Sequence, residues 1–204
     1  MKHFGIPDAG IRRIAEAAGA PMLTEEIEKH FVDRTNRHIK LVQKYCKLIA
    51  SEWSGLEELI ERGEKHDASK FGSDELVPYI WLTWRYKCKD DGVECNLPDG
   101  MEDDIDKATE HHILSNAHHP EYHQSETEGL LNKEDRDAPP DEMVDATGMS
   151  DLDIAECAAD WCAMSEERGN TPREWAEKNV NVRWKFTPEQ ESLIFDLIDS
   201  VWNE

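Results

Sequence analysis

Apolar side chains recur at helical spacing along most of the chain, and the longest such stretch runs from residue 24 to about residue 50. The inward positions of this stretch are separated by steps of three, four or seven residues: Ile27, Phe31, His38, Val42, Tyr45 and Ile49. Thr24 is a suitable N-cap, and acidic residues follow it, as is favourable at a helix start. The pattern predicts one long helix.

Shorter segments with the same spacing follow along the rest of the chain. Pro78 falls late for a first turn and delays the start of its helix. Pro120 disfavours a helical conformation in the residue before it, and Gly169 is a natural helix end. Thr-Pro pairs with Glu or Gln at the third helical position mark the last two starts. The predicted helices are 54–64, 73–88, 101–118, 150–168 and two that begin after Thr171 and Thr187.

These segments leave no convincing strand pattern, so we expect an all-α fold of about seven helices. Residues 124–149 are polar and acidic and contain Pro139-Pro140, which predicts a long loop or lid. We find neither a repeat nor a linker that would divide the chain. The expectation is a single helical domain over 1–204, with a core of about 24–168 and C-terminal helices at 171–203 packed on it.

The formal net charge of −22 changes which partners are plausible. A nucleic-acid polymer is not expected, because its phosphates would be repelled. A small phosphorylated substrate is still compatible, since a bound cation reverses the field within one pocket. The absence of a long apolar run and of an apolar signal core predicts a cytoplasmic protein without a membrane segment. Its five cysteines are then expected to be reduced.

Histidines and aspartates provide the candidate chemistry. His66-Asp67 is an adjacent nitrogen and oxygen donor pair that could hold a divalent cation at a helix end. Such a pair alone is more commonly a helix cap or a surface feature. His38 lies in the long first helix among apolar neighbours, and a satisfied core histidine is the commoner outcome for that position.

A second cluster places five histidines within residues 111–123. On a helix, His112, Asn116 and His119 share one face, and His111, Ser115 and His118 lie on the neighbouring face. Such imidazoles repel one another when protonated and gain most by staying neutral around a cation. The alternative reading is a helix end that is rich in histidine by accident.

A third candidate lies in the helix predicted over 150–168. Glu156 and Asp160 are four residues apart, among alanine, cysteine, tryptophan and methionine. A carboxylate buried there would need a cation, an arginine or water. The open alternative is an amphipathic helix that turns both acids toward solvent.

In chain order these pieces resemble the HD superfamily of metal-dependent phosphohydrolases: an early histidine, a His-Asp pair, intervening histidines and a late aspartate. A family of small uncharacterised HD-like proteins of bacteria and phages is more similar still. Its motifs are matched by His66-Asp67-Ala68-Ser69-Lys70-Phe71, by His112, Asn116, His118 and His119, and by Glu156, Asp160, Trp161, Ala163 and Met164, with Cys157 in place of the usual methionine.

The resemblance implies an HD-like helical fold and a metal centre. One divalent ion would be held by His38, His66, Asp67 and Asp160. A second would be held by His112 with His118 or His119 and bridged by Asp67. Manganese, iron, cobalt, magnesium, nickel and zinc all remain open as its identity. Asp67, Lys70 and Glu75 are the expected catalytic residues, with Lys70 and Asn116 contacting substrate and Glu75 acting as general base or as orienter of a ligand histidine.

The function that this resemblance implies is a phosphohydrolase acting on a nucleotide or another small phosphate ester. Two alternatives are open at this stage. The same kind of site suits a di-iron oxygenase acting on a small molecule. The chain could also be a non-catalytic acidic interaction protein in which the site only stabilises the fold. A homodimer is compatible with each of the three readings.

Overall fold

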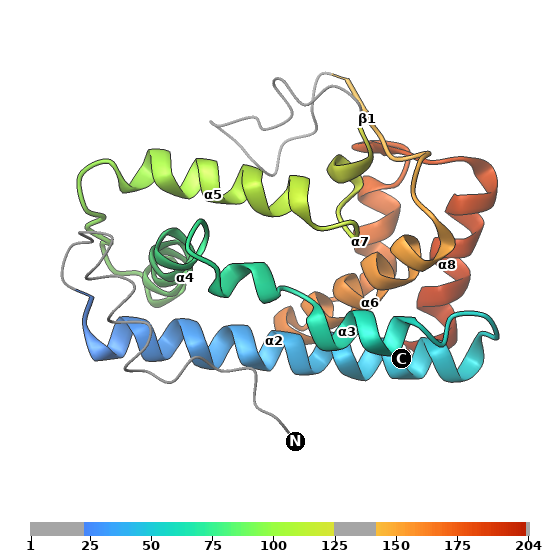
Figure 1. Cartoon of the computed structure of the whole chain (residues 1–204), viewed down its shortest axis with the longest axis horizontal. Coiled ribbons are helices and arrows are strands. Elements are labelled where there is room, and N and C mark those ends of the chain that lie inside the picture. Colours follow the sequence, from blue (N-terminus) through green and yellow to red (C-terminus); the bar gives the residue numbers. More distant parts are fainter. Residues whose placement is uncertain (1–22, 125–141, 203–204) are drawn as a thin grey trace. The chain divides into compact units, whose positions relative to one another are not determined.

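The computed structural model describes residues 23–124 and 142–202, and these residues fold almost entirely into helices (Figure 1). The expected all-α class, with about seven helices, is confirmed for this part of the chain. The elements in chain order are α2 (Glu25–Glu52), α3 (Leu59–Lys65), the 3₁₀ turn η1 (Ala68–Phe71), α4 (Leu76–Asp91), α5 (Met101–Ser115), the 3₁₀ turn η2 (Pro120–His123), β1 (Val144–Asp145), α6 (Asp151–Arg168), α7 (Pro172–Asn179), β2 (Trp184–Lys185) and α8 (Pro188–Val201).

The chain forms two compact units, each with its own hydrophobic core. The described part of unit 1 comprises residues 23–36 and 68–112, and that of unit 2 comprises 37–67, 113–124 and 142–202. Two of the three unit boundaries fall within α2 and α5, and the third lies between Asp67 and Ala68, after α3. The core of unit 1 is built around Phe31, Leu76 and Ile80, and its edge includes Phe71, whose ring centroid lies 5.6 Å from that of Phe31.

The core of unit 2 is organised around α6, which packs against α3, α7 and α8 (Figure 1). One side of α6 is lined by small buried residues, among them Ala155, Ala159 and Ala163, which let neighbouring backbones approach closely. Trp161 of α6 stacks on Trp184 of β2, with ring centroids 5.5 Å apart and planes inclined by 21°. Such aromatic pairs add specific geometry to the area they bury.

Helix starts and ends largely follow the local signals in the sequence. Ser150 and Thr187 each form a capping box with the residue three positions later, and the Thr171 side chain caps α7. Gly169 ends α6 in the left-handed conformation expected of it, at φ 69°. The helix predicted at 73–88 begins only at Leu76, so that Pro78 occupies the first turn, where its missing N–H costs nothing.

Helix α5 ends at Ser115, three residues before the predicted end. The chain then turns, and the His119 N–H donates to the Asn116 carbonyl at 3.0 Å. His119 is extended, at φ −89° and ψ 129°, as the residue before a proline prefers. The prediction that His112, Asn116 and His119 share one helical face is therefore wrong, because only His112 belongs to the helix.

The predicted loop at 124–149 is also corrected where the structure describes it. Its residues 125–141 lie outside the described part of the chain. Near its end, β1 pairs in parallel with β2, in the register Val144 to Trp184, a strand pair that the sequence pattern did not predict. Val144, Ala146 and Met149 are buried in the core of unit 2. This end of the segment is thus part of the packed structure.

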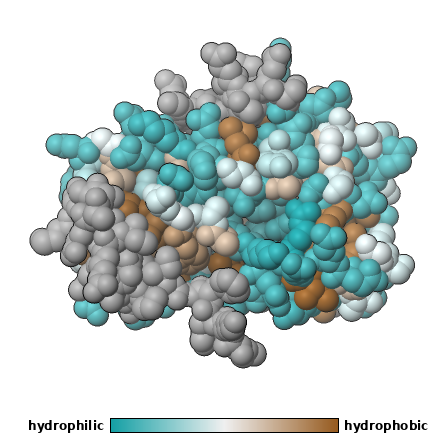
Figure 2. Space-filling view, in the orientation of Figure 1, coloured by the Kyte–Doolittle hydropathy of each residue, from teal (hydrophilic) through white to brown (hydrophobic). Residues whose placement is uncertain are grey.

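The surface reflects the composition of the chain. Figure 2 shows hydrophilic residues over much of the drawn face, as expected for a chain with 45 acidic and 23 basic residues. Among the helices of the described residues, none combines the length and the apolar character that a membrane crossing requires.

Gly63 in α3 makes a close contact that the sequence did not reveal. A Cβ atom at this position would lie 3.0 Å from Sγ of Cys46, a fully buried residue of the core. We expect Gly63→Ala to lower the free energy of unfolding by about 1–3 kcal/mol, because Cys46 has little room to move aside. Glu64→Ala, at the next and exposed position, is the control. Equal melting temperatures for the two variants, by circular dichroism, would contradict this packing argument.

Candidate metal centre

The His66-Asp67 pair lies where α3 ends and the backbone changes direction. His66 is extended at φ −51° and ψ 134°, and Asp67 is left-handed at φ 58°. Few residues other than glycine adopt that conformation, and Asp and Asn tolerate it best. Both side chains are buried, and His66 Nε2 lies 3.7 Å from Asp67 Oδ1. The turn therefore holds two adjacent donors inside unit 2.

Two more donors reach the pair from distant parts of unit 2. His38 of α2 places Nε2 3.7 Å from Oδ2 of Asp67. Asp160 of α6 places Oδ1 3.0 Å from Nε2 of His38 and 3.9 Å from Nε2 of His66. All four residues that the sequence predicted for a first ion are thus brought together. His38, His66 and Asp67 are all buried and form a group that could hold a metal ion, and Asp160 lies beside this group.

The separations between these donors fit ligands of one ion. Metal–ligand bonds of about 2.1 Å place two donors about 3.0 Å apart at a right angle and about 3.4 Å apart in a tetrahedron, with about 4.2 Å as the limit for opposite ligands. The observed nitrogen–oxygen distances of 3.0, 3.7, 3.7 and 3.9 Å fall within this range, with Asp67 presenting Oδ2 to His38 and Oδ1 to His66. The donor set of two imidazoles and two carboxylates suits several divalent transition metals.

Two of the donor atoms are buried without a hydrogen-bond partner among the described residues. These atoms are Nε2 of His66 and Oδ1 of Asp160. A buried polar atom left unsatisfied costs about 1–3 kcal/mol, and a charged one costs more. His38 Nε2 lies 3.0 Å from Asp160 Oδ1, so a proton on His38 or a cation shared by the two residues could offset the buried charge.

Glu156, one helical turn before Asp160, orients His66. Its Oε1 lies 2.9 Å from Nδ1 of His66, and its Oε2 accepts from Nε of Arg62 at 2.7 Å. A proton on Nδ1 leaves the lone pair of Nε2 free for a cation, as is usual for metal-binding histidines. Burial alone would raise the pKa of Glu156, but His118 and His66 hold that pKa well below its usual range.

Arg62 also binds Asp153 at 2.6 Å, and Asp153 belongs to the capping box that begins α6. The start of the helix, the orienting carboxylate and the end of α3 are therefore linked by charge-assisted hydrogen bonds. The sequence analysis missed Arg62. It lies in no motif, and its partners are more than ninety residues away along the chain.

The ionisation of the remaining donors is set by burial and by their neighbours. Burial opposes the charge on Asp160, but His38 lowers the pKa of this carboxyl to about 2. Burial likewise opposes protonation of His38, but Asp160 and Glu167 raise its pKa to about 9. In the metal-free protein a proton on His38 thus balances the aspartate. Metal binding would displace this proton.

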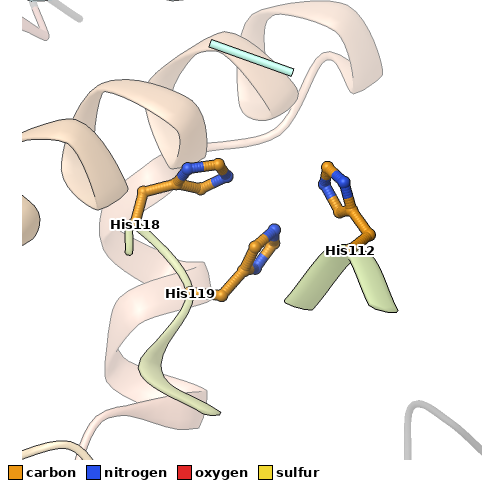
Figure 3. A group of neighbouring side chains, drawn as sticks. All are labelled: His112, His118 and His119. Atoms are coloured by element: carbon orange, nitrogen blue, oxygen red, sulfur yellow. The ribbon is translucent and has the colours of Figure 1, made fainter. Parts of the chain in front are cut away.

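His118 belongs to the same cluster in unit 2. Its ring centroid lies 4.3 Å from that of His66, and its Nδ1 lies 3.5 Å from Oε1 of Glu156. With His66 and Asp160 it forms another group able to hold a metal ion. Burial lowers the pKa of His118, which favours the neutral imidazole that a cation needs. His119, the next residue, has its ring centroid 4.2 Å from that of His118 (Figure 3).

His112, also labelled in Figure 3, belongs to unit 1, where Glu75 is fully buried. The two oxygens of Glu75 lie 2.9 Å from Nδ1 of His112 and 2.8 Å from Nδ1 of His111. Ser69 donates to Glu75 at 3.0 Å. With both oxygens engaged, Glu75 has the contacts of a residue that orients imidazoles, the second of the two roles expected for it.

The other sequence-predicted residues have the following places. Lys70, in η1, has its Nζ 5.3 Å from the ring centroid of Tyr79 within unit 1. Asn116 follows α5 in unit 2 and is half-buried. The second ion predicted on His112 with His118 or His119 would join residues assigned to different units, and it stays a prediction.

Comparison with known proteins assigns the chain to a family whose function is unknown. No curated protein and no solved structure matches the chain. Residues 27–200 match the model of a family described as a family of unknown function (DUF5662). The match extends over all of the candidate metal donors and over most of the chain. The chain therefore belongs to this family of unknown function, DUF5662.

Proposed function

We propose that the protein is a metal-dependent phosphohydrolase acting on a nucleotide or another small phosphate ester. In this proposal His38, His66, Asp67 and Asp160 hold a divalent ion. The observation that carries it is the pair of buried, unpartnered donor atoms, Nε2 of His66 and Oδ1 of Asp160, beside the donors His38 and Asp67. A cation would satisfy both atoms together. The resemblance to HD-type hydrolases supplies the reaction class.

Charge balance supports a phosphorylated substrate. A divalent ion would neutralise Asp67 and Asp160, and Arg62 offsets part of the negative charge of Glu156 and Asp153. An anionic phosphate ester would therefore approach a centre far less negative than the chain as a whole, whose formal charge is −22. Without the ion, the two aspartates would repel such a substrate.

The roles of the protein groups follow from their contacts. When bound, a divalent ion lowers the pKa of coordinated water and polarises a phosphoryl oxygen. Glu156 keeps the proton of His66 on Nδ1, so that Nε2 stays available. The left-handed turn at Asp67 fixes the direction of its carboxylate. Lys70 and Asn116 are proposed to contact the substrate, with Lys70 acting as a point charge on phosphate. We propose the cytoplasm as the place of action, with one or two ions in each chain.

The first test is the variant Asp67→Asn. Because Asn tolerates the left-handed conformation, the backbone should keep its course while the anionic ligand is lost. We expect loss of bound metal, measured by elemental analysis, and loss of phosphate release from a panel of nucleotides and phosphate esters. Asp196→Asn, at an exposed position of α8, should match the wild type in both measurements.

Full metal content and full turnover in Asp67→Asn would overturn the proposal. Iron in the purified protein, together with oxygen uptake and no phosphate release from any compound in the panel, would instead assign oxygenase chemistry to the same donors.

The second test is metal removal. Because four buried donors lose their shared partner, exhaustive chelation should lower the melting temperature of the purified protein, and adding the metal back should restore it. A ligand present at 100 times its Kd stabilises a protein by about 2.7 kcal/mol. A melting temperature that does not change on chelation of a metal-loaded sample would show that no ion is held by the folded state.

A further inference from the structure

Helix α6 carries a stripe of four carboxylates, of which the first, Asp153, binds Arg62 near the start of the helix. Glu156, Asp160 and Glu167 are separated by four and seven residues, and at 100° per residue their directions fall within about 40° of one another. Glu156 orients His66, and Asp160 is the ligand proposed on this helix. Glu167, in the last turn, has so far been described only as a neighbour that raises the pKa of His38.

Glu167 lies behind His38 in the same way as Glu156 lies behind His66. Its Oε2 is 3.4 Å from Nδ1 of His38, while Nε2 of that imidazole faces Asp160 at 3.0 Å. Both side chains are almost fully buried, with 8% of Glu167 and 7% of His38 exposed. A carboxylate thus backs each of the two histidines in the proposed ligand set.

An arginine stands on the outer side of each carboxylate. Nε of Arg62 donates to Glu156 at 2.7 Å, and Nε of Arg37 donates to Glu167 at 3.5 Å. The two series, Arg62 to Glu156 to His66 and Arg37 to Glu167 to His38, have the same order and use the same ring atom, Nδ1. Both carboxylates belong to α6, whereas Arg37 and His38 come from α2, and Arg62 and His66 come from α3 and its C-terminal end.

The chemistry of imidazole explains why a carboxylate such as Glu167 is needed beside Nδ1 of His38. A neutral histidine that binds an ion through Nε2 carries its proton on Nδ1, and a buried N–H needs an acceptor. Nδ1 of His38 is buried and makes no hydrogen bond within the described residues. Glu167, at 3.4 Å, is the carboxylate in place to accept that proton with a small movement.

We propose that Glu167, with the exposed Arg37 as its outer neighbour, is a positioning residue that fixes the tautomer and orientation of His38 toward the ion. This inference rests on the proposed ion at His38, His66, Asp67 and Asp160. A carboxylate behind a ligand histidine raises the basicity of the ring as well as its order. Glu167 should therefore affect both how tightly an ion is bound and its ligand field.

The test uses the full chain, freed of metal by chelation and titrated with Co²⁺, whose visible absorption reports the ligand field. Glu167→Ala should weaken Co²⁺ binding by about 10- to 100-fold, and it should shift the absorption bands. Glu167→Gln keeps an acceptor oxygen and should fall between Glu167→Ala and the wild type. Glu166→Gln is the matched control. It removes the same charge from the adjacent position, where the carboxylate binds Lys44 and Tyr45 instead. Its binding and spectrum should match the wild type.

Each outcome separates this inference from the proposed function. If the wild type binds no Co²⁺, the metal centre itself is refuted and the inference goes with it. If the wild type binds Co²⁺ and both Glu167 variants match it in affinity and spectrum, only the inference is overturned. If Glu166→Gln and Glu167→Gln weaken Co²⁺ binding equally, the effect comes from the loss of one negative charge and not from the position of Glu167. This outcome would also overturn the inference. If circular dichroism shows that Glu167→Ala does not fold, the isosteric variant Glu167→Gln is compared with the wild type instead.

Discussion

The desolvation of charged and polar donors at one point in unit 2 is the constraint on which the rest of this site depends. Asp67 lies beside two imidazoles with almost no access to water, and Asp160 adds a buried oxygen, although 16% of its side chain is exposed. Isolated buried carboxylates would be very costly, so the protein must supply counter-charge. In the metal-free state a proton on His38 supplies part of it, while Arg62 offsets the neighbouring carboxylates of Glu156 and Asp153. A divalent cation is the counter-charge that the four donors are spaced to receive.

Helix α6 uses different sides for packing in the core and for the carboxylates of the site. Its small residues, such as Ala155 and Ala159, pack in the core of unit 2, while its carboxylates face the donor group. The position of the carboxylates depends on this packing, because α6 is fixed against its neighbouring helices and Asp160 is fixed with it. Arg62 then connects the start of α6 to the end of α3, where the left-handed Asp67 aims its side chain.

Much of the fold could be predicted, because helix starts, ends and periodicity depend on residues a few positions apart. The caps at Thr171 and Thr187 and the stop at Gly169 are of this kind. The end of α5 was predicted wrongly, since the pattern continued past Ser115 while the backbone turned. The parallel pairing of β1 with β2 was missed for a related reason. Two-residue strands carry no periodicity, and Val144 meets Trp184 only in the folded chain.

The sequence by itself determined the helical class, most helix boundaries and, through a family resemblance, the four donors that the structure brings together. Only the tertiary structure decided which groups surround them. Arg62 reaches Glu156 across 94 positions, and Arg37 reaches Glu167 across 130. Backbone signals act between near neighbours and can be read locally. The partner of a buried charge is whichever side chain the packing of distant helices places beside it, and no local pattern records that choice.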